Sequence, residues 1–151
     1  MEEQAYLTIK NIDIPLIEDL ENMPVPLVVG EGEDYWTLEP GKDEWNQLTA
    51  NTFLNSRFYN DPLDGVAKYA KIGVRPILFI EGLDEYNLTK YQDSVEIFGK
   101  DWVYIGNNEL FASKTLFTSK FDHNTHDYDD SYLKYRLENW LKYNLKEFNE
   151  D

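Results

Sequence analysis

The chain has 151 residues, a formal net charge of −15 and no cysteine. A chain of this length buries roughly two-thirds of its unfolded surface, and its aromatic content of 15% argues against general disorder. The lack of cysteine excludes disulfides, a thiol nucleophile and a thiolate zinc site. We therefore expect a single packed domain over residues 1–151.

Most of the negative charge lies in the first third of the chain. Residues 1–44 hold twelve acidic residues against Lys10 and Lys42, whereas residues 45–120 hold nine acidic residues against eight basic ones. A field of this sign repels nucleic acid, which binds through Lys and Arg at its phosphates, and attracts basic protein surfaces. The first third is therefore either a solvated acidic face or a docking surface for a basic protein partner, with no direct contact to nucleic acid.

Nothing in the chain is typical of secretion or membrane insertion. No apolar run approaches the about 20 residues that a membrane span needs. Glu2 and Glu3 stand where a signal peptide has basic residues. We expect no signal peptide, no membrane partner, and a location in the cytoplasm or in something assembled there.

Short apolar stretches predict four strands early in the chain, over residues 6–9, 12–14, 26–29 and 35–38. Pro15, Pro24 and Pro26 leave room for at most a short helical turn over residues 16–22. Residues 43–56 fit either a short helix or an irregular segment, because Asn and Thr are frequent there.

The middle of the chain predicts an antiparallel meander. A strand over residues 77–80 follows the segment Gly73-Val74-Arg75-Pro76, and residues 83–92 form a polar linker or a short helix. Three further strands are predicted over residues 95–98, 102–105 and 109–113. Turns that contain glycine separate these strands, which is typical of hairpins.

The last predicted element is an amphipathic helix. Its apolar residues recur at helical spacing, at Leu133, Leu137, Trp140, Leu141, Leu145 and Phe148. Asp129, Asp130 and Ser131 are candidates for its N-cap. The predicted fold class is therefore α+β, with a small, mostly antiparallel sheet and one long C-terminal amphipathic helix against it.

Several of these stretches together match a known pattern. Residues 98–105 (Phe-Gly-Lys-Asp-Trp-Val-Tyr-Ile) and the Arg136–Leu141 segment resemble the opening half of an uncharacterised domain family of bacterial surface proteins and phage-encoded proteins. That family is related to C-type-lectin-like folds and to the formylglycine-generating enzyme. Residues 35–41 and 73–76 are similar to two features of its closing half. Because the halves are in reverse order here, the resemblance implies a circular permutation.

The resemblance implies a C-type-lectin-like fold over residues 26–145 and leaves a glycan partner open. The family usually has Arg and Ser before its Pro-Gly turn, where this chain has Leu38 and Glu39. A family-wide binding role of that strand is therefore not implied. The calcium-site motifs of sugar-binding C-type lectins and the cysteines of the formylglycine-type enzymes are absent.

Four large side chains have predicted structural roles. Arg75 is expected to be buried with a carboxylate or several carbonyl groups as partners, and to tie its strand to an acidic loop. A ligand-binding arginine is the alternative. Trp36, Trp102 and Trp140 are expected in the core, with an aromatic platform for a ligand as the alternative.

The loop over residues 122–130 is the only stretch with metal-ligand character. His123 and His126 could bind zinc, manganese or iron together with its carboxylates, and Asp127 and Asp129 could bind calcium. The spacing matches no established motif, and the alternative is a polar loop whose acids cap the helix. We predict no metal, no cofactor and no catalytic residue, since no nucleophile elbow or phosphate loop occurs.

Three functions remain open, and the first is preferred. It is a non-enzymatic recognition module that docks a macromolecular partner through acidic and aromatic loops. The second is an acidic inhibitor that mimics nucleic acid in a host DNA- or RNA-binding enzyme, and the third is a metal-dependent hydrolase that uses the 122–130 loop. The predicted partner-binding residues are Glu31, Glu33, Asp34, Tyr35, Glu39, Asp43 and Glu44.

Overall fold

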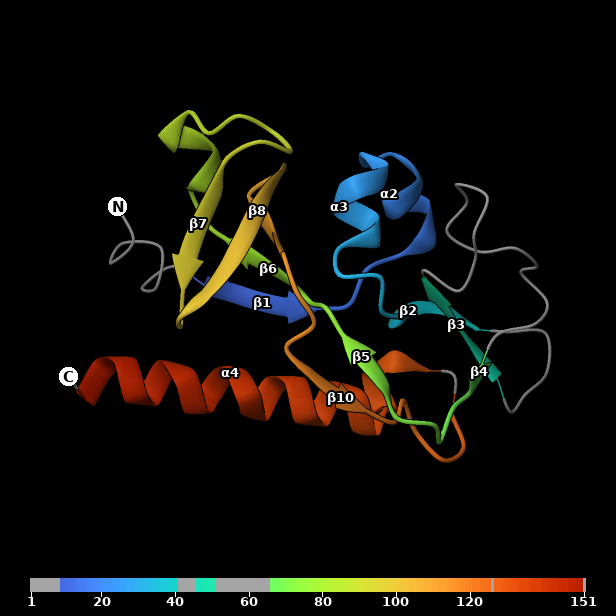
Figure 1. Cartoon of the computed structure of the whole chain (residues 1–151). Coiled ribbons are helices and arrows are strands. Elements are labelled where there is room, and N and C mark those ends of the chain that lie inside the picture. The colour runs from blue at the N-terminus through green and yellow to red at the C-terminus, as the bar shows by residue number, and fades with distance from the viewer. Residues whose placement is uncertain (1–8, 41–45, 51–65, 126, 151) are drawn as a thin grey trace.

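The computed structural model describes residues 9–40, 46–50, 66–125 and 127–150 (Figure 1). These residues form an α+β protein with two five-stranded, mostly antiparallel sheets and a long C-terminal helix, α4 (Tyr132–Glu150). The predicted class and the terminal helix are confirmed, but there are two sheets where the sequence predicted one small sheet. Within the described ranges, no helix is long and apolar enough to cross a membrane.

The first sheet is antiparallel, with strand order β1-β6-β9-β8-β7. Its strands are β1 (Ile9–Asp13), β6 (Ile77–Ile80), β7 (Ser94–Ile97), β8 (Lys100–Gly106) and β9 (Glu109–Ala112). The predicted meander over residues 95–113 is confirmed, with small shifts at the strand ends. Its hairpins close through Phe98 and Gly99, and through Asn107 and Asn108, because all four adopt the positive φ that two-residue loops require.

The second sheet has the order β10-β5-β2-β3-β4. Its strands are β2 (Tyr35–Pro40), β3 (Asn46–Ala50), β4 (Val66–Ala67), β5 (Ile72–Val74) and β10 (Phe117–Ser119). β2 runs parallel to β5, with Tyr35 opposite Gly73. The chain passes directly from β5 to β6 through Arg75 and Pro76. The segment that the sequence singled out is therefore the junction between the two sheets.

Two stretches differ from the sequence-based expectation. Residues 26–29 do not form a strand but lie in helix α3 (Val25–Val29), whose first turn accommodates Pro26 because no helical hydrogen bond is lost there. Residues 46–50, expected in a helix or an irregular segment, form β3 between β2 and β4.

The short helical segments are confirmed. The turn predicted over residues 16–22 is helix α2 (Ile17–Glu21), and the polar segment over residues 83–92 contains the 3-10 helix η1 (Leu83–Tyr86). The strand predicted over residues 6–9 lies outside the described part of the chain except for Ile9, where β1 begins.

The main core contains α4 and tryptophans from both sheets. Leu133 and Leu137 of α4 are fully buried in it together with Trp36 and Trp102, as the sequence predicted. The indole N–H of Trp36 donates to the carbonyl of Ser119 (2.7 Å), so burial leaves no unpaired donor there. Trp140, which was also predicted in the core, is only partly buried.

A second, smaller cluster lies under α2 and α3. Leu20 of α2 and Val28 of α3 are fully buried there against Phe111 of β9, with Ile77 and Ile105 beside them. Figure 1 shows α2 and α3 on one side of the molecule and α4 on the other. The two helical layers thus present separate surfaces to solvent.

Candidate functional site

Arg75 is 2% exposed at the junction of the two sheets. Its guanidinium donates to three carbonyl oxygens, of Leu27 (2.8 Å) and Val28 (2.9 Å) in α3 and of Ala112 (2.8 Å) in β9. It also lies 4.1 Å from the centre of the Phe111 ring, and burial lowers the pKa of Arg75. The predicted structural pin is confirmed, but its hydrogen bonds go to carbonyls of a helix and a strand rather than to an acidic loop.

Tyr35, predicted to contact a partner, lies in the core instead. Its side chain is fully buried, its hydroxyl donates to the carbonyl of Val28 (2.7 Å), and its ring packs edge-on against Phe111. A fully buried side chain does not reach a partner: Tyr35 follows an acidic loop in sequence, but it starts β2, the middle strand of the second sheet. Burial raises the pKa of Tyr35, which keeps the hydroxyl a donor.

The predicted acidic residues differ in their surroundings. Glu31 and Glu33 are exposed in the loop after α3. Asp34 and Glu39 are half-buried, and burial raises the pKa of both carboxyls. Asp43 and Glu44, which were also predicted to bind a partner, lie outside the described part of the chain.

Glu39 lies close to acids that the sequence did not single out. Its Oε1 accepts a hydrogen bond from the backbone N–H of Ile17 (3.0 Å) at the start of α2. Burial is the main cause of its raised pKa, and the charges of Asp19 and Glu18 on α2 raise it further.

Glu109 of β9 and Asp13 of β1 belong to the same group. Burial raises the pKa of Glu109, and the charges of Asp19 and Asp13 add to this shift. Burial also raises the pKa of Asp13, against the lowering effect of a hydrogen bond from Asn11, and the nearby charges of Lys134, Asp129 and Glu138 lie on the α4 side of this residue. The charge of Asp19 acts on both Glu39 and Glu109, that of Glu18 on Glu39, and that of Asp13 on Glu109. These carboxylates are named the α2 acidic face: Asp13, Glu18, Asp19, Glu39 and Glu109. Glu109 was missed because only the fold brings β9 beside residues from the first third.

Exposed apolar side chains occur on the same layer of the molecule. Leu16 directly precedes α2 and is 36% exposed, whereas Val25 and Val29 lie on α3 and are 43% and 40% exposed. Single exposed apolar residues are common on protein surfaces. Three of them at the start of α2 and on α3 give this layer a mixed acidic and apolar character.

We expect mild acid to stabilise the fold through these carboxyls. A carboxyl with a raised folded-state pKa binds its proton more readily in the folded protein than in the unfolded chain. For Glu109 and Glu39 this contribution rises as the pH falls from 7 through the folded pKa, and it levels off below the ordinary value of 4.5. Glu109→Gln should therefore raise the melting temperature at pH 7 and reduce its increase between pH 7 and pH 4.5.

The control for that measurement is Glu96→Gln, which removes the same charge from an exposed position on β7. Melting curves between pH 4 and pH 8 compare the two variants. An identical pH dependence of both variants and the unmodified protein would contradict the assignment of the effect to Glu109.

In the 122–130 loop, which was considered as a metal site, the first acidic residue binds backbone groups. The carboxylate of Asp122 accepts hydrogen bonds from the backbone N–H groups of Asn124 (2.9 Å), Thr125 (3.1 Å) and Tyr132 (2.9 Å). Burial alone would raise the pKa of Asp122, but these bonds outweigh it and lower the pKa. Ser131 caps α4, since its Oγ accepts from the N–H of Lys134 (3.0 Å).

One later acid of this loop contacts α4. Asp129 forms an ion pair with Lys134 at 3.0 Å. In the part of the chain that the structure describes, no three His, Asp or Glu side chains gather as metal ligands would, and His126 lies outside that part. Of the N-cap candidates Asp129, Asp130 and Ser131, the described hydrogen bonds assign the cap to Ser131, while the early acid Asp122 rather than the last acids of the loop binds the N–H of Tyr132.

Tyr128 in this loop has a buried hydroxyl with no hydrogen-bond partner among the described residues. Burial raises the pKa of Tyr128, and nearby acids, including Asp13, raise it further. Removing an unpaired buried hydroxyl stabilises a protein, so Tyr128→Phe should gain about 1 kcal/mol of unfolding free energy. Tyr35→Phe is the matched control and should lose about 1 kcal/mol, because its hydroxyl is paired. Urea unfolding that gives both changes the same sign would contradict this reading.

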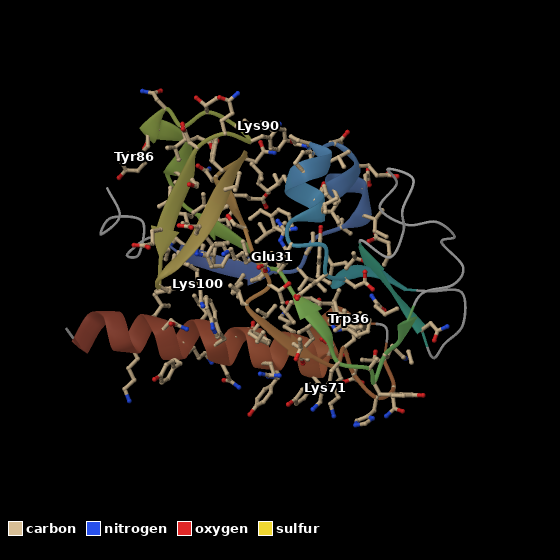
Figure 2. All side chains as sticks on the ribbon, viewed as in Figure 1. Glu31, Trp36, Lys71, Tyr86, Lys90 and Lys100 are labelled. Carbon is tan, nitrogen blue, oxygen red and sulfur yellow. The ribbon has the colours of Figure 1, made fainter. Side chains whose placement is uncertain are left out.

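Two hollows lie away from the α2 acidic face. One, of about 380 Å³, is lined by Glu31 and Asp101 together with Lys100 and Lys114, so its charges balance. Figure 2 labels Glu31 and Lys100 in this region.

The other hollow, of about 340 Å³, is lined by basic, aromatic and hydroxyl side chains and is named the basic hollow: Tyr69, Lys71, Thr118, Ser119, Lys120, Tyr132 and Arg136. Figure 2 shows Lys71 on the side away from α2 and α3. The sequence did not indicate this hollow, because its residues come from three distant segments.

Comparison with known proteins found no matching family model, no similar curated protein and no similar solved structure. Functional argument therefore depends on the geometry of the two charged surfaces.

Proposed function

We propose that this protein is a non-enzymatic recognition module that docks a basic surface of a protein partner through the α2 acidic face. The observation that supports this most strongly is that Glu39 and Glu109 are both half-buried and both within range of the charge of Asp19, so that the pKa of each carboxyl is raised. Half-burying carboxylates beside one another is unfavourable in the free protein. Lysine or arginine side chains of a partner would relieve that cost, which favours association with a basic surface.

The exposed apolar residues at the start of α2 and on α3 support a protein partner over a small cation. Interfaces between proteins combine an apolar centre with a polar rim. Leu16, Val25 and Val29 supply apolar area next to the acids, and they are 36–43% exposed. The carboxylates would thus attract the basic partner, and these three apolar side chains would be buried against it.

The test is capture of partners from host lysate on the immobilised protein at low and high salt. The double variant Glu18→Gln/Asp19→Asn should reduce the amount of partner captured. High salt should reduce capture by the unmodified protein, because screening slows charge-steered association about tenfold or more. The control pair Glu96→Gln with Asp101→Asn removes two exposed charges on the β7–β8 hairpin. Capture that is independent of the salt concentration would refute the proposal. So would equal weakening of capture by the two double variants.

A second candidate concerns the nature of the partner. The convergence of carboxylates from β1, α2, β2 and β9 favours an inhibitor that occupies a nucleic-acid-binding channel, where it would replace phosphates. A captured partner should then release the protein when DNA or RNA is added. A partner that binds the protein and nucleic acid simultaneously would exclude this mode.

The C-type-lectin-like fold and the site of action remain part of the proposal. We infer a circularly permuted C-type-lectin-like domain from the resemblance of residues 98–105 and 73–76, and an origin in the cytoplasm or a phage particle. The strand order of the two sheets can be compared with that of such domains after exchange of the two halves. A strand order that disagrees in both arrangements would refute the inferred fold.

A further inference from the structure

The basic hollow is unusual in a chain with about twice as many acidic as basic residues. Lys71, Lys120 and Arg136 converge on it from the start of β5, the end of β10 and the first turns of α4. Among the described residues that line it there is no carboxylate. Three cations without a lining acid repel one another, and an anion between them would remove that repulsion.

Neighbouring groups hold two of these cations in place. The Nη1 of Arg136 donates to the carbonyl of Thr118 (3.1 Å), and its guanidinium lies 4.5 Å from the centre of the Phe117 ring. The Nζ of Lys120 lies 4.5 Å from the centre of the Tyr132 ring and 2.7 Å from Nε2 of His123, which leaves further N–H donors of the ammonium for a ligand. The bond to Thr118 uses one of the five N–H donors of Arg136, and a guanidinium fork suits bidentate binding of phosphate oxygens.

The hollow lies beside the start of α4, but the helix amides do not serve it. The backbone N–H of Tyr132 donates to Asp122, that of Leu133 to the carbonyl of Phe121, and that of Lys134 to Ser131. An anion in the basic hollow would therefore be bound by side chains rather than by free helix N–H groups. This makes the side-chain variants below a direct test.

We propose that the basic hollow binds a small phosphate monoester that carries an aromatic group, such as a nucleoside monophosphate. Lys71, Lys120 and Arg136 bind the phosphate. Tyr69, which is 63% exposed at the rim, stacks against the aromatic group. A hollow of about 340 Å³ is within the size range of small-molecule sites.

The charge of the whole protein favours a small ligand over a nucleic-acid strand. At physiological salt the Debye length is about 8 Å, so a phosphate inside the hollow is governed by the three nearest cations. A longer strand would extend over acidic surface of a chain whose net charge is −15, and would be repelled there. The proposal concerns a site separate from the α2 acidic face and does not depend on the proposed function.

Calorimetric titration of the full chain with AMP, inorganic phosphate and adenosine tests this site. AMP should bind more tightly than inorganic phosphate, and adenosine should show no binding without the phosphate. Lys71→Gln and Arg136→Gln should each weaken AMP binding about tenfold, the effect of losing one charge-assisted contact. Lys71 is exposed, so its variant tests the site even where Arg136→Gln impairs folding.

Lys142→Gln is the matched control, since it removes one exposed lysine from α4 away from the hollow. Its affinity for AMP should equal that of the unmodified protein. Absence of AMP binding at millimolar concentration would overturn the proposal. So would equal affinity for AMP and inorganic phosphate, or equal weakening by the Lys71, Arg136 and Lys142 variants.

Discussion

Arg75→Met is expected to lower the unfolding free energy by about 4 kcal/mol, because it leaves buried carbonyl groups without donors. Leu27 and Ala112 each lose the hydrogen bond that Arg75 donates to them. Val28 keeps the hydroxyl of Tyr35 as a donor and suffers less. Methionine fills much of the same volume, so the measured loss in urea unfolding reports on the hydrogen bonds and the cation–π contacts.

Two further variants separate charge from geometry at this position. Arg75→Lys retains the positive charge, but a single ammonium cannot reach acceptors in both α3 and β9, so it should also be strongly destabilised. Arg136→Met is the control for an arginine outside the core junction. If Arg75→Met were as stable as the unmodified protein, the desolvation cost of the guanidinium would cancel the stabilising free energy of its contacts. The role of Arg75 as a structural pin would then be refuted.

Gly73→Ala is expected to cost about 3 kcal/mol, because β5 has no room for a methyl group at this position. A Cβ on Gly73 would lie 2.7 Å from the carbonyl oxygen of Asp34 and 2.9 Å from Cγ2 of Thr115. The Asp34 oxygen belongs to the backbone just before β2, the strand that pairs in parallel with β5. Relief of the contact would therefore require the two strands to move apart.

The control is Gly32→Ala, where a Cβ meets no atom within 4 Å but φ is +86°. Its cost of about 1 kcal/mol reflects backbone strain alone. Thr115→Ser removes the methyl group near Gly73, so the double variant Gly73→Ala/Thr115→Ser should recover a minor part of the loss. Equal urea midpoints for Gly73→Ala and Gly32→Ala would contradict the close approach at β5.

The predicted parts of the fold are those whose local sequence pattern determines the structure. The meander was predictable because alternating apolar residues meet Gly99 and Asn107 at turns that need positive φ. Helix α4 was predictable from the spacing of Leu133 and Leu137. In contrast, residues 26–29 have the apolar, β-branched composition of a strand, yet Pro24 and Pro26 start a helix there. Local propensity could not decide between the two.

The candidate sites were less predictable than the fold, because both depend on tertiary proximity. The acidity of the first third was visible, but the contribution of Glu109 required the pairing of β1, β6 and β9. The same limit applies to the basic hollow, whose cations Lys71, Lys120 and Arg136 are dispersed in sequence. Tyr35 shows the opposite error, since an acidic neighbourhood in sequence suggested exposure for a residue that the sheets bury.

The pairing of β1 with β6 has a consequence for the nascent chain. Asp13 lies opposite Ile77, so the first strand emerges from the ribosome about 60 residues ahead of its partner. At a synthesis rate of about 5–20 residues per second, the backbone N–H and C=O groups of β1 stay unpaired for several seconds. The dense carboxylates of residues 1–44 then act as gatekeepers against intermolecular strand addition, and their neutralisation should increase aggregation during cell-free translation.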